Sequence, residues 1–448
     1  MNYFRYVILL ISTLSITFIY SNRIVFGFTV ICQVPENNTR TDYYLAQPVA
    51  KAWMFTATAI GMCLGPIPLH WVYKYDTRIL ILIYGLISTF SSAFYPLFDS
   101  IGLWPSLASR FLAGFGQASH LHFSNEVVLV WAQEKEKSLF FSLLLSASQL
   151  GPLFTKILGG EMCASSFGWE ATYYVLAFLT LTFTLIFAFI YTQDVKSNRF
   201  VSDEEVVMII TGRKKLEEVG AVPYRDLLSD VSIWTSLVMF IGYYIGMIIY
   251  QLYSPTFIKQ VLHYSIRETG YFSAIPMLFA IFVKVAVGKS IDYGFGLSQK
   301  WRLAAPLVIL ESISALSIFL VGFIDNRVVS LAFNMLFASL HFFVPVICSR
   351  TIQIIGAQYA HIALNFNMFI AGFVQILIPG TIHLMVPDNT KEQWSHVFYC
   401  LAASIVTTTV LYVALVKVRP ASWTTSKQEK ASNGKKILSF SQISVKVN

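Results

Sequence analysis

Long apolar runs separated by short polar breaks extend through almost the whole chain. A helix crosses a bilayer with about 20 mostly apolar residues, and twelve runs reach that length. We predict transmembrane helices at residues 4–32, 49–72, 79–98, 104–132, 138–160, 171–192, 231–254, 269–292, 303–323, 328–349, 360–386 and 396–416. Transmembrane strands would instead appear as alternating segments of about ten residues. The predicted fold class is all-α, a polytopic membrane protein with twelve transmembrane helices.

The longest polar stretch, residues 194–230, divides these runs into two sets of six. We therefore predict an N-terminal six-helix half at 1–192, a cytosolic linker at 193–230, a C-terminal six-helix half at 231–418 and a disordered cytosolic tail at 419–448. Two helical halves with a site between them near the middle of the bilayer are typical of secondary transporters.

Composition and charge support this interpretation. Only 12% of the residues are charged, whereas soluble domains carry about a quarter, and no basic stretch alternates with aromatic residues as in nucleic-acid-binding proteins. With the N-terminus in the cytosol, 22 Lys and Arg residues fall in cytosolic segments and six in the opposite loops. This bias predicts that both termini are cytosolic. The sequence Asn37-Asn38-Thr39 then lies outside the cytosol, where Asn37 is a candidate glycosylation site.

The cysteines and the polar motifs give no sign of an enzyme or a metal site. Five cysteines are scattered singly, without a CxxC pair or a nearby histidine at ligand spacing, so we expect no metal, no cofactor and no disulfide framework. The chain also lacks a Gly-rich phosphate loop, paired intramembrane aspartates and a nucleophile beside a base.

Charged residues inside the predicted spans are candidates for function, because each costs about 2.5–3.5 kcal/mol to insert. Arg23 and Arg110 each lie on a polar helix face that carries no acidic residue, so they favour binding of a carboxylate or phosphate. Glu126 lies four residues after His122, and the two can satisfy each other. Lys156 is expected to reach the exoplasmic end of its helix.

Two further helices add polar faces. In the seventh span Tyr243 and Tyr250 share a face, and in the tenth span His341 does so with Asn334. Both tyrosines could be ordinary packing residues, and His341 could form a helix-to-helix hydrogen bond. Glu311 and Lys284 could form a structural pair or each reach the membrane surface. The candidate substrate-binding residues are Arg23, Arg110, Gln117, Tyr243, Tyr250 and His341.

Several short motifs occur in a fixed order. They are Arg110-Phe-Leu-Ala-Gly114, the turn from Trp131 to Ser138, the sequence Ser148 to Gly151, and Gly168-Trp169 followed by Tyr173-Tyr174. Because of the order and spacing of these motifs, residues 4–416 resemble the anion:cation symporter family of the major facilitator superfamily. This family includes the sodium/phosphate cotransporters, sialin and the vesicular glutamate transporters. The resemblance implies the major facilitator fold, a cavity lined by helices one, four, seven and ten, and anion binding by Arg23 and Arg110.

The chain departs from this family at a residue linked to proton coupling. The family's fourth-helix glutamate is Gln117 here, and a neutral amide cannot carry a proton. The proline five residues later is His122, and the seventh-helix arginine of the glutamate carriers aligns near Tyr243. Glu126 and His341 are the remaining coupling candidates, with proton or sodium as the coupling ion.

The leading hypothesis is a secondary active transporter of organic anions or inorganic phosphate that works by alternating access. Its expected partners are a small anionic solute and membrane lipid. The alternative is a transporter-like receptor or binding protein that does not transport its ligand. The resemblance places the protein in the plasma membrane or an endolysosomal or vesicle membrane.

Overall fold

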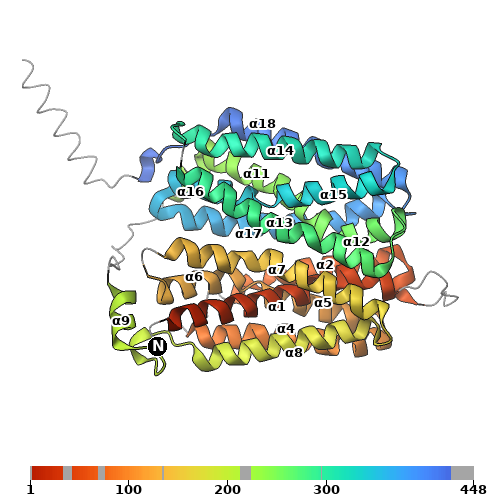
Figure 1. The fold of residues 1–448 in the computed structure, drawn as a ribbon, viewed down its shortest axis with the longest axis horizontal. Helices are drawn as coiled ribbons and strands as arrows, with labels where there is room; N and C mark the ends of the chain where they lie inside the picture. The colour runs from red at the N-terminus through yellow and green to blue at the C-terminus, as the bar shows by residue number, and fades with distance from the viewer. Residues whose placement is uncertain are drawn as a thin grey trace, which may run out of the picture.

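The computed structural model describes residues 3–33, 43–68, 76–133, 136–211, 223–293 and 295–424. Within these ranges every regular element is a helix (Figure 1), so the all-α prediction is confirmed. The first set of helices comprises α1 (Phe4–Gln33), α2 (Pro48–Leu64), α4 (Thr77–Ile101), α5 (Leu103–Gln117), α6 (His120–Trp131), α7 (Lys137–Ala164) and α8 (Gly168–Ile190).

The second set contains more irregular helices. It comprises α11 (Val231–Ile248), the π-helical segment η3 (Ile249–Tyr253), α12 (Ser254–Thr256), the π-helical segment η4 (Phe257–Val261), α13 (Ile266–Tyr293), α14 (Gln299–Phe323), α15 (Arg327–His341), α16 (Val344–Gly356), α17 (Ala360–Met385) and α18 (Lys391–Leu415). Short helices lie at the ends: η1 (Tyr44–Ala46), η2 (Val195–Ser197), α9 (Asp203–Ile210), α10 (Tyr224–Ser229), η5 (Ala357–Tyr359) and η6 (Ser422–Thr424).

Over its described residues, each of the twelve predicted spans coincides with one helix or with consecutive helices, and residues 69–72 of the second span lie outside the described residues. Ten helical stretches of the described chain are long and apolar enough to cross a membrane. The other two predicted spans are helical but shorter or divided. The second contains α2, which has 17 residues, and the fourth is divided into α5 and α6.

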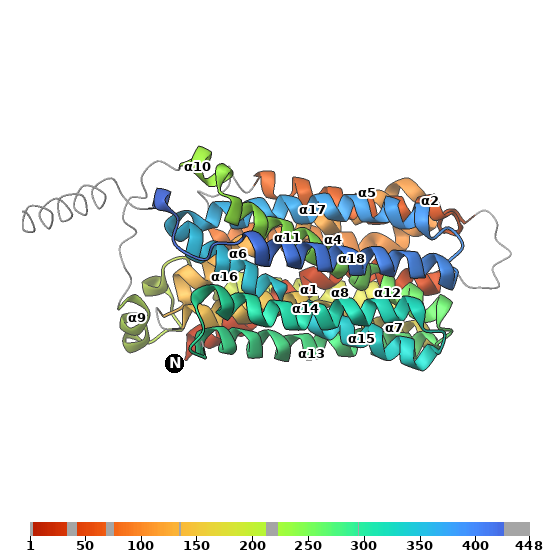
Figure 2. The ribbon, with the colours of Figure 1, turned by 90° about the horizontal axis from the view of Figure 1, so that it is seen from above.

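The two sets of helices form two layers that lie side by side along the length of the molecule (Figures 1 and 2). Across the boundary α7 packs against α13, and α2 packs against α17. The start of α1 lies at the same end of the bundle as α9 (Figure 1). We call this the α9 end, and the end of α1 and α7 reached by Gln33 and Ala164 the opposite end.

The segment that follows α8 is anchored to the first set of helices. The buried carboxylate of Glu205, on α9, accepts hydrogen bonds from the backbone nitrogens of Phe4 and Arg5 at 3.0 and 3.1 Å. The Arg5 guanidinium also pairs with Glu205 at 3.1 Å and with Glu136 at 2.9 Å. A carboxylate at the start of α1 satisfies free N–H groups and complements the helix dipole, so α9 fixes the first turn of α1.

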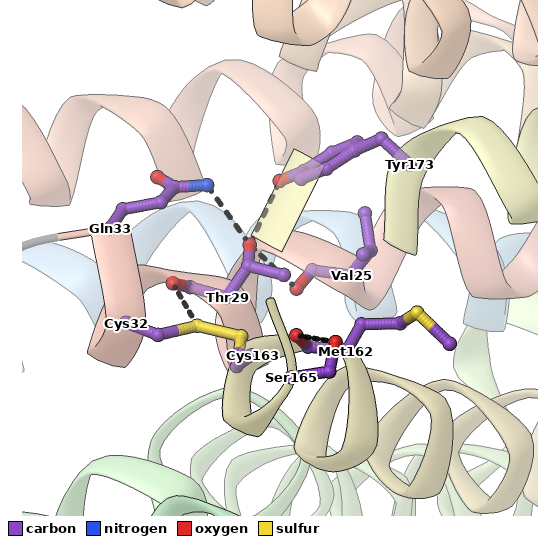
Figure 3. Close-up of a disulfide and its surroundings, with 8 residues drawn as sticks. All are labelled: Val25, Thr29, Cys32, Gln33, Met162, Cys163, Ser165 and Tyr173. Atoms are coloured by element: carbon purple, nitrogen blue, oxygen red, sulfur yellow. Dashed lines mark hydrogen bonds between the residues drawn. A yellow bond between two sulfur atoms is a disulfide. The ribbon is translucent and has the colours of Figure 1, made fainter. Parts of the chain in front are cut away.

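The expectation of no disulfide was wrong. Cys32, near the end of α1, is bonded to Cys163, near the end of α7 (Figure 3). The two residues are 131 positions apart, and only the packing of α7 along α1 brings them together. Beside them, Thr29 contacts the Tyr173 hydroxyl at 3.0 Å and accepts a hydrogen bond from Gln33. The disulfide therefore joins these two helices at the opposite end from α9.

Candidate functional site

The fourth and tenth spans are interrupted at equivalent places. Helices α5 and α15 each have 15 residues, and each is followed by a short break and a second helix. Gln117 is the last residue of α5, and His341 is the last residue of α15. Repeated six-helix halves are expected to share such features, and discontinuous helices often lie beside transporter binding sites. Two of the sequence-predicted residues therefore stand at corresponding breaks.

Arg23 connects the two sets of helices. It projects from α1 and is 4% exposed. Its Nη1 donates to Oε1 of Gln375 on α17 at 2.8 Å, and its Nη2 donates to Oε1 of Gln251 on η3 at 3.4 Å. The guanidinium also lies 4.5 Å from the ring centroid of Tyr20, whose hydroxyl donates to the same Gln251 oxygen at 3.0 Å. Arg23 thus lies on the boundary between the halves.

The π-helical turn η3 brings Gln251 to this boundary. A π-helix widens the turn and often occurs at functional sites. Helix α1 approaches it closely, because a Cβ added at Gly27 would lie 3.2 Å from the Cα and the carbonyl oxygen of Leu252. A side chain at this position would therefore require the neighbouring backbone to give way slightly.

Lys156 does not reach the end of its helix, so the sequence-based expectation was wrong. The side chain is 1% exposed, and its Nζ donates to the carbonyl oxygen of Ser273 on α13 at 3.2 Å. The ammonium also lies 4.6 Å from the ring centroid of Tyr250. Helix α13 covers the lysine because Gly160 and Gly270 allow α7 and α13 to touch: a Cβ on Gly270 would lie 3.0 Å from the Cα of Gly160.

Arg110 has a different environment. It is 1% exposed and lies within the first set of helices, where Nη1 donates to the carbonyl oxygen of Asn22 at 3.2 Å and Nη2 donates to the carbonyl oxygen of Arg23. Its guanidinium lies 5.8 Å from the ring centroids of Phe26 and Tyr95. Arg110 therefore binds the backbone of α1 within the first set of helices. Unlike Arg23, it donates no hydrogen bond to α17 or η3 among the described residues.

The centre of the molecule has an excess of positive charge and unpaired polar atoms. In the described part of the chain, no carboxylate lies within ion-pair distance of Arg23, Arg110 or Lys156. Buried atoms there without a hydrogen-bond partner include Nε of Arg23, Oε1 of Gln117 and both amide atoms of Gln149. Unsatisfied buried polar groups each cost about 1–3 kcal/mol. A small anion would gain donors from the cations and amides.

The remaining candidates of the second half form a separate cluster. His341 contacts the Glu311 carboxylate through Nδ1 at 3.0 Å and the carbonyl oxygen of Tyr243 through Nε2 at 3.2 Å. Tyr250 contacts both neighbourhoods. Its ring centroid lies 6.1 Å from that of Phe342, the residue after His341. Its hydroxyl donates to the backbone carbonyl oxygen of Ser273 at 3.3 Å, the same oxygen that accepts from Lys156. Lys284 makes no ion pair with Glu311 among the described residues, so the alternative of a pair between them was wrong.

Two predicted residues have no described partner. Glu126 is half-buried on α6, but the His122 side chain lies outside the described residues, as does Asn37. Conversely, the sequence analysis missed three buried amides at the centre, Gln149, Gln251 and Gln375. Their signal was present as uncharged polar residues within long apolar runs, a signal that was used for Gln117, Tyr243, Tyr250 and His341 and was not applied to these three amides.

Comparison with known proteins identifies the family and the fold. The family model of the Major Facilitator Superfamily matches residues 9–379. Human sialin (Homo sapiens) is 24% identical over 87% of this chain and 80% of its own length, and the sodium-dependent phosphate transport protein 1 of Mus musculus is 21% identical over 86% and 84%. The probable small intestine urate exporter of Mus musculus is 22% identical over 86% and 80%.

Solved structures show the same fold. A D-xylose-proton symporter aligns with a TM-score of 0.71 at 14% identity, covering 95% of this chain and all of its own. An inward-facing bacterial homolog of the human lysosomal transporter Spinster aligns with a TM-score of 0.65 at 15% identity, over 92% and 95%. The predicted fold is confirmed, and the relatives agree with the resemblance to the anion:cation symporters. The chain is a multi-pass membrane transporter that belongs to the Major Facilitator Superfamily.

Proposed function

We propose that this protein is a secondary active transporter of a small organic anion or inorganic phosphate, and that the anion binds between the two halves beside Arg23 and Lys156. One observation carries the proposal. Both cations project from the first half, at residues of α1 and α7, and both contact uncharged acceptors on the second half. The boundary therefore carries positive charge with no carboxylate among the described residues to balance it.

The energetics favour an anion at this place. Burying a charge without a counter-charge is expensive, and amide or carbonyl oxygens offset only part of the cost. An anion between Arg23 and Lys156 would supply the missing negative charge and accept hydrogen bonds from the unpaired Nε of Arg23 and from Gln149. The planar guanidinium suits a carboxylate or phosphate because it presents parallel donors.

The same contacts would couple binding to movement of the halves. Residues 1–192 and 231–418 act in this proposal as the two moving bodies, joined by residues 193–230. Arg23 holds Gln251 and Gln375 across the boundary. An anion that competes for the Arg23 donors would loosen these contacts, which provides a differential interaction between states of the transporter.

The relatives support the substrate class. Their names include a sodium-dependent phosphate transport protein and a probable urate exporter, and both phosphate and urate are compact anions. Proton and sodium remain the coupling ions to test. In this chain Gln117 replaces the family's glutamate, so coupling would use another residue.

Orientation follows from charge and from the disulfide. The excess of Lys and Arg in the segments at the α9 end supports cytosolic termini. The Cys32–Cys163 bond lies at the opposite end, and disulfides persist in oxidising compartments outside the cytosol. Either the plasma membrane or an endolysosomal or vesicle membrane satisfies both conditions. Asn37 would then face the compartment where glycosylation occurs.

Counterflow in proteoliposomes tests the proposal. Vesicles containing the purified full chain and loaded with unlabelled phosphate or urate should take up the same labelled anion, whereas labelled D-xylose and choline serve as neutral and cationic controls. Uptake of the anion alone supports the proposal. Binding of the anion without exchange would instead favour the receptor alternative, and exchange of xylose or choline would contradict the substrate class.

A further inference from the structure

His341, at the break of the tenth span, contacts the buried carboxylate of Glu311 on α14. The side chains of His341 and Glu311 are both 0% exposed, and they join α15 to α14 through Nδ1 contacts of 3.0 and 3.2 Å to the two carboxylate oxygens. The other ring nitrogen faces the carbonyl oxygen of Tyr243, on α11, at 3.2 Å. The pair therefore touches three helices of the second half.

The number of protons on the pair decides which of its contacts are hydrogen bonds. Both ring nitrogens of His341 face acceptors, so beside an ionised Glu311 only an imidazolium donates from both nitrogens at once. If Glu311 is protonated instead, its O–H donates to Nδ1 and only Nε2 keeps a hydrogen. In both arrangements the pair is neutral overall and holds one proton more than a carboxylate beside a neutral imidazole. Loss of that proton would leave one ring nitrogen without a hydrogen, facing either the Glu311 carboxylate or the Tyr243 carbonyl oxygen.

The surroundings provide no substitute for this proton. Among the described residues no Lys or Arg lies within ion-pair distance of Glu311. The titratable groups that interact with Glu311 are the Tyr243 phenol of α11 and the Cys348 thiol of α16. On α13 and α18, the titratable residues nearest the middle of each helix are Lys284 and Cys400, and among the described residues neither forms a hydrogen bond or an ion pair with His341 or Glu311. A deprotonated pair would place a net negative charge in the membrane interior, which is costly.

The pair is also tightly packed against α11, beside the break in the tenth span. A Cβ added at Gly246 would lie 2.5 Å from Nε2 of His341, so α11 meets the imidazole with no space between them. Residues 342–343 interrupt the helix directly after His341. Tyr243 and Gln251 lie eight residues apart on the seventh span, about 12 Å along its axis. The same span therefore contacts the pair at one point and Arg23 at another.

We propose that His341 and Glu311 form the proton-binding site that couples anion transport to the proton gradient, an inference that rests on the proposed transport function. The proton enters from water on one side of the membrane as an N–H or O–H bond forms, and it leaves to water on the other side when that bond breaks. Release is costly while the pair is buried. It becomes favourable when movement at the break in the tenth span admits water.

Two measurements test the proposal on the purified full chain. The first is infrared difference spectroscopy over a pH titration, which follows carboxyl protonation without any substrate. The second is uptake of labelled urate or phosphate into proteoliposomes with an imposed pH gradient. A gradient of about one pH unit drives up to about tenfold accumulation when one proton accompanies each monovalent anion.

The variants are Glu311→Gln, which keeps an acceptor for His341, and His341→Gln, with Glu392→Gln on the exposed start of α18 as the matched control. We expect both pair variants to lose the pH-driven accumulation and to retain counterflow at equal pH, while Glu311→Gln also removes a carboxyl signal from the infrared titration. Glu392→Gln should behave as wild type in the infrared titration, in the pH-driven uptake and in counterflow at equal pH.

Some outcomes would overturn the proposal. They are wild-type counterflow without any pH-driven accumulation, full accumulation by both pair variants, or loss of accumulation in Glu126→Gln while Glu311→Gln keeps it. If the wild type shows no counterflow at all, the transport function fails instead, and the infrared titration alone decides whether the pair binds a proton.

Discussion

The guanidinium of Arg110 donates a hydrogen bond to the backbone carbonyl oxygen of Arg23. The two arginines thus have different positions relative to the boundary: Arg23 points across it to Gln251 and Gln375, and Arg110 holds the backbone from which Arg23 projects. We interpret Arg23 as an anion-binding residue and Arg110 as a positioning residue.

This distinction predicts different effects of substituting Arg110. Arg110→Ala removes the charged hydrogen bonds to the carbonyl oxygens of Asn22 and Arg23, which keep only their intrahelical donors, and a hydrogen bond to a charged group contributes about 1.5–3 kcal/mol. We expect a lower Tm and weaker anion binding together, with partial recovery of both in Arg110→Lys, because an ammonium reaches one of the two carbonyls. Exposed Arg199→Lys is the control. An Arg110→Ala protein with wild-type Tm and no anion binding would show direct contact with the ligand instead.

The contact between Gly160 and Gly270 predicts a shift between states. In Gly270→Ala the new Cβ would lie 2.6 Å from the carbonyl oxygen of Lys156, so α7 and α13 must separate at the opposite end from α9. Overpacking of this kind costs about 1–3 kcal/mol. The reporter is Glu161→Cys in a background without other free cysteines. We expect this cysteine to react faster with a charged thiol reagent in Gly270→Ala than in the parent protein that carries the same cysteine.

Gly288→Ala on the same helix provides the matched control, since no atom lies within 4 Å of a Cβ at that position. Its labelling rate should equal that of the parent. Equal rates in all three proteins would show that the glycine contact does not hold the two helices closed.

The Cys32–Cys163 disulfide predicts a loss of stability on removal. We expect Cys32→Ser, Cys163→Ser and the double variant to lower the Tm by similar amounts, corresponding to about 2–4 kcal/mol for a typical disulfide. The exposed Cys400→Ser is the control. Thiol labelling of the denatured protein with and without a reductant provides a direct count: two additional thiols should appear on reduction, and no increase would mean that the bond is absent.

The helices could be predicted because a membrane protein must bury its backbone polar groups in long apolar helices, and such runs are visible in the sequence. The breaks in the fourth and tenth spans could not be placed in this way, since each break lies within a run that is long and apolar enough on average to be predicted as a single span. The π-helical turns around Gln251 were also missed, because a changed hydrogen-bond register has no simple sequence pattern.

The site was predicted in part. Arg23 was identified from the absence of an acidic residue on its helix face, and the structure places it at the boundary. Lys156 was misjudged because its position along α7 suggests access to the membrane surface, whereas the packing of α13 at Gly160 and Gly270 closes that route. The partner of His341 is 30 residues away in sequence, a pairing that depends on how α14 and α15 associate.

The most direct test of this account is the affinity of the purified protein for labelled urate or phosphate in wild type, Arg23→Gln and Lys156→Gln. A hydrogen bond to a charged group contributes about 1.5–3 kcal/mol, so each variant should bind about 10- to 100-fold more weakly. Lys284→Gln removes another intramembrane cation, one outside the site, and should bind as wild type. Unchanged affinity in monodisperse Arg23→Gln and Lys156→Gln would contradict an anion site between the two halves.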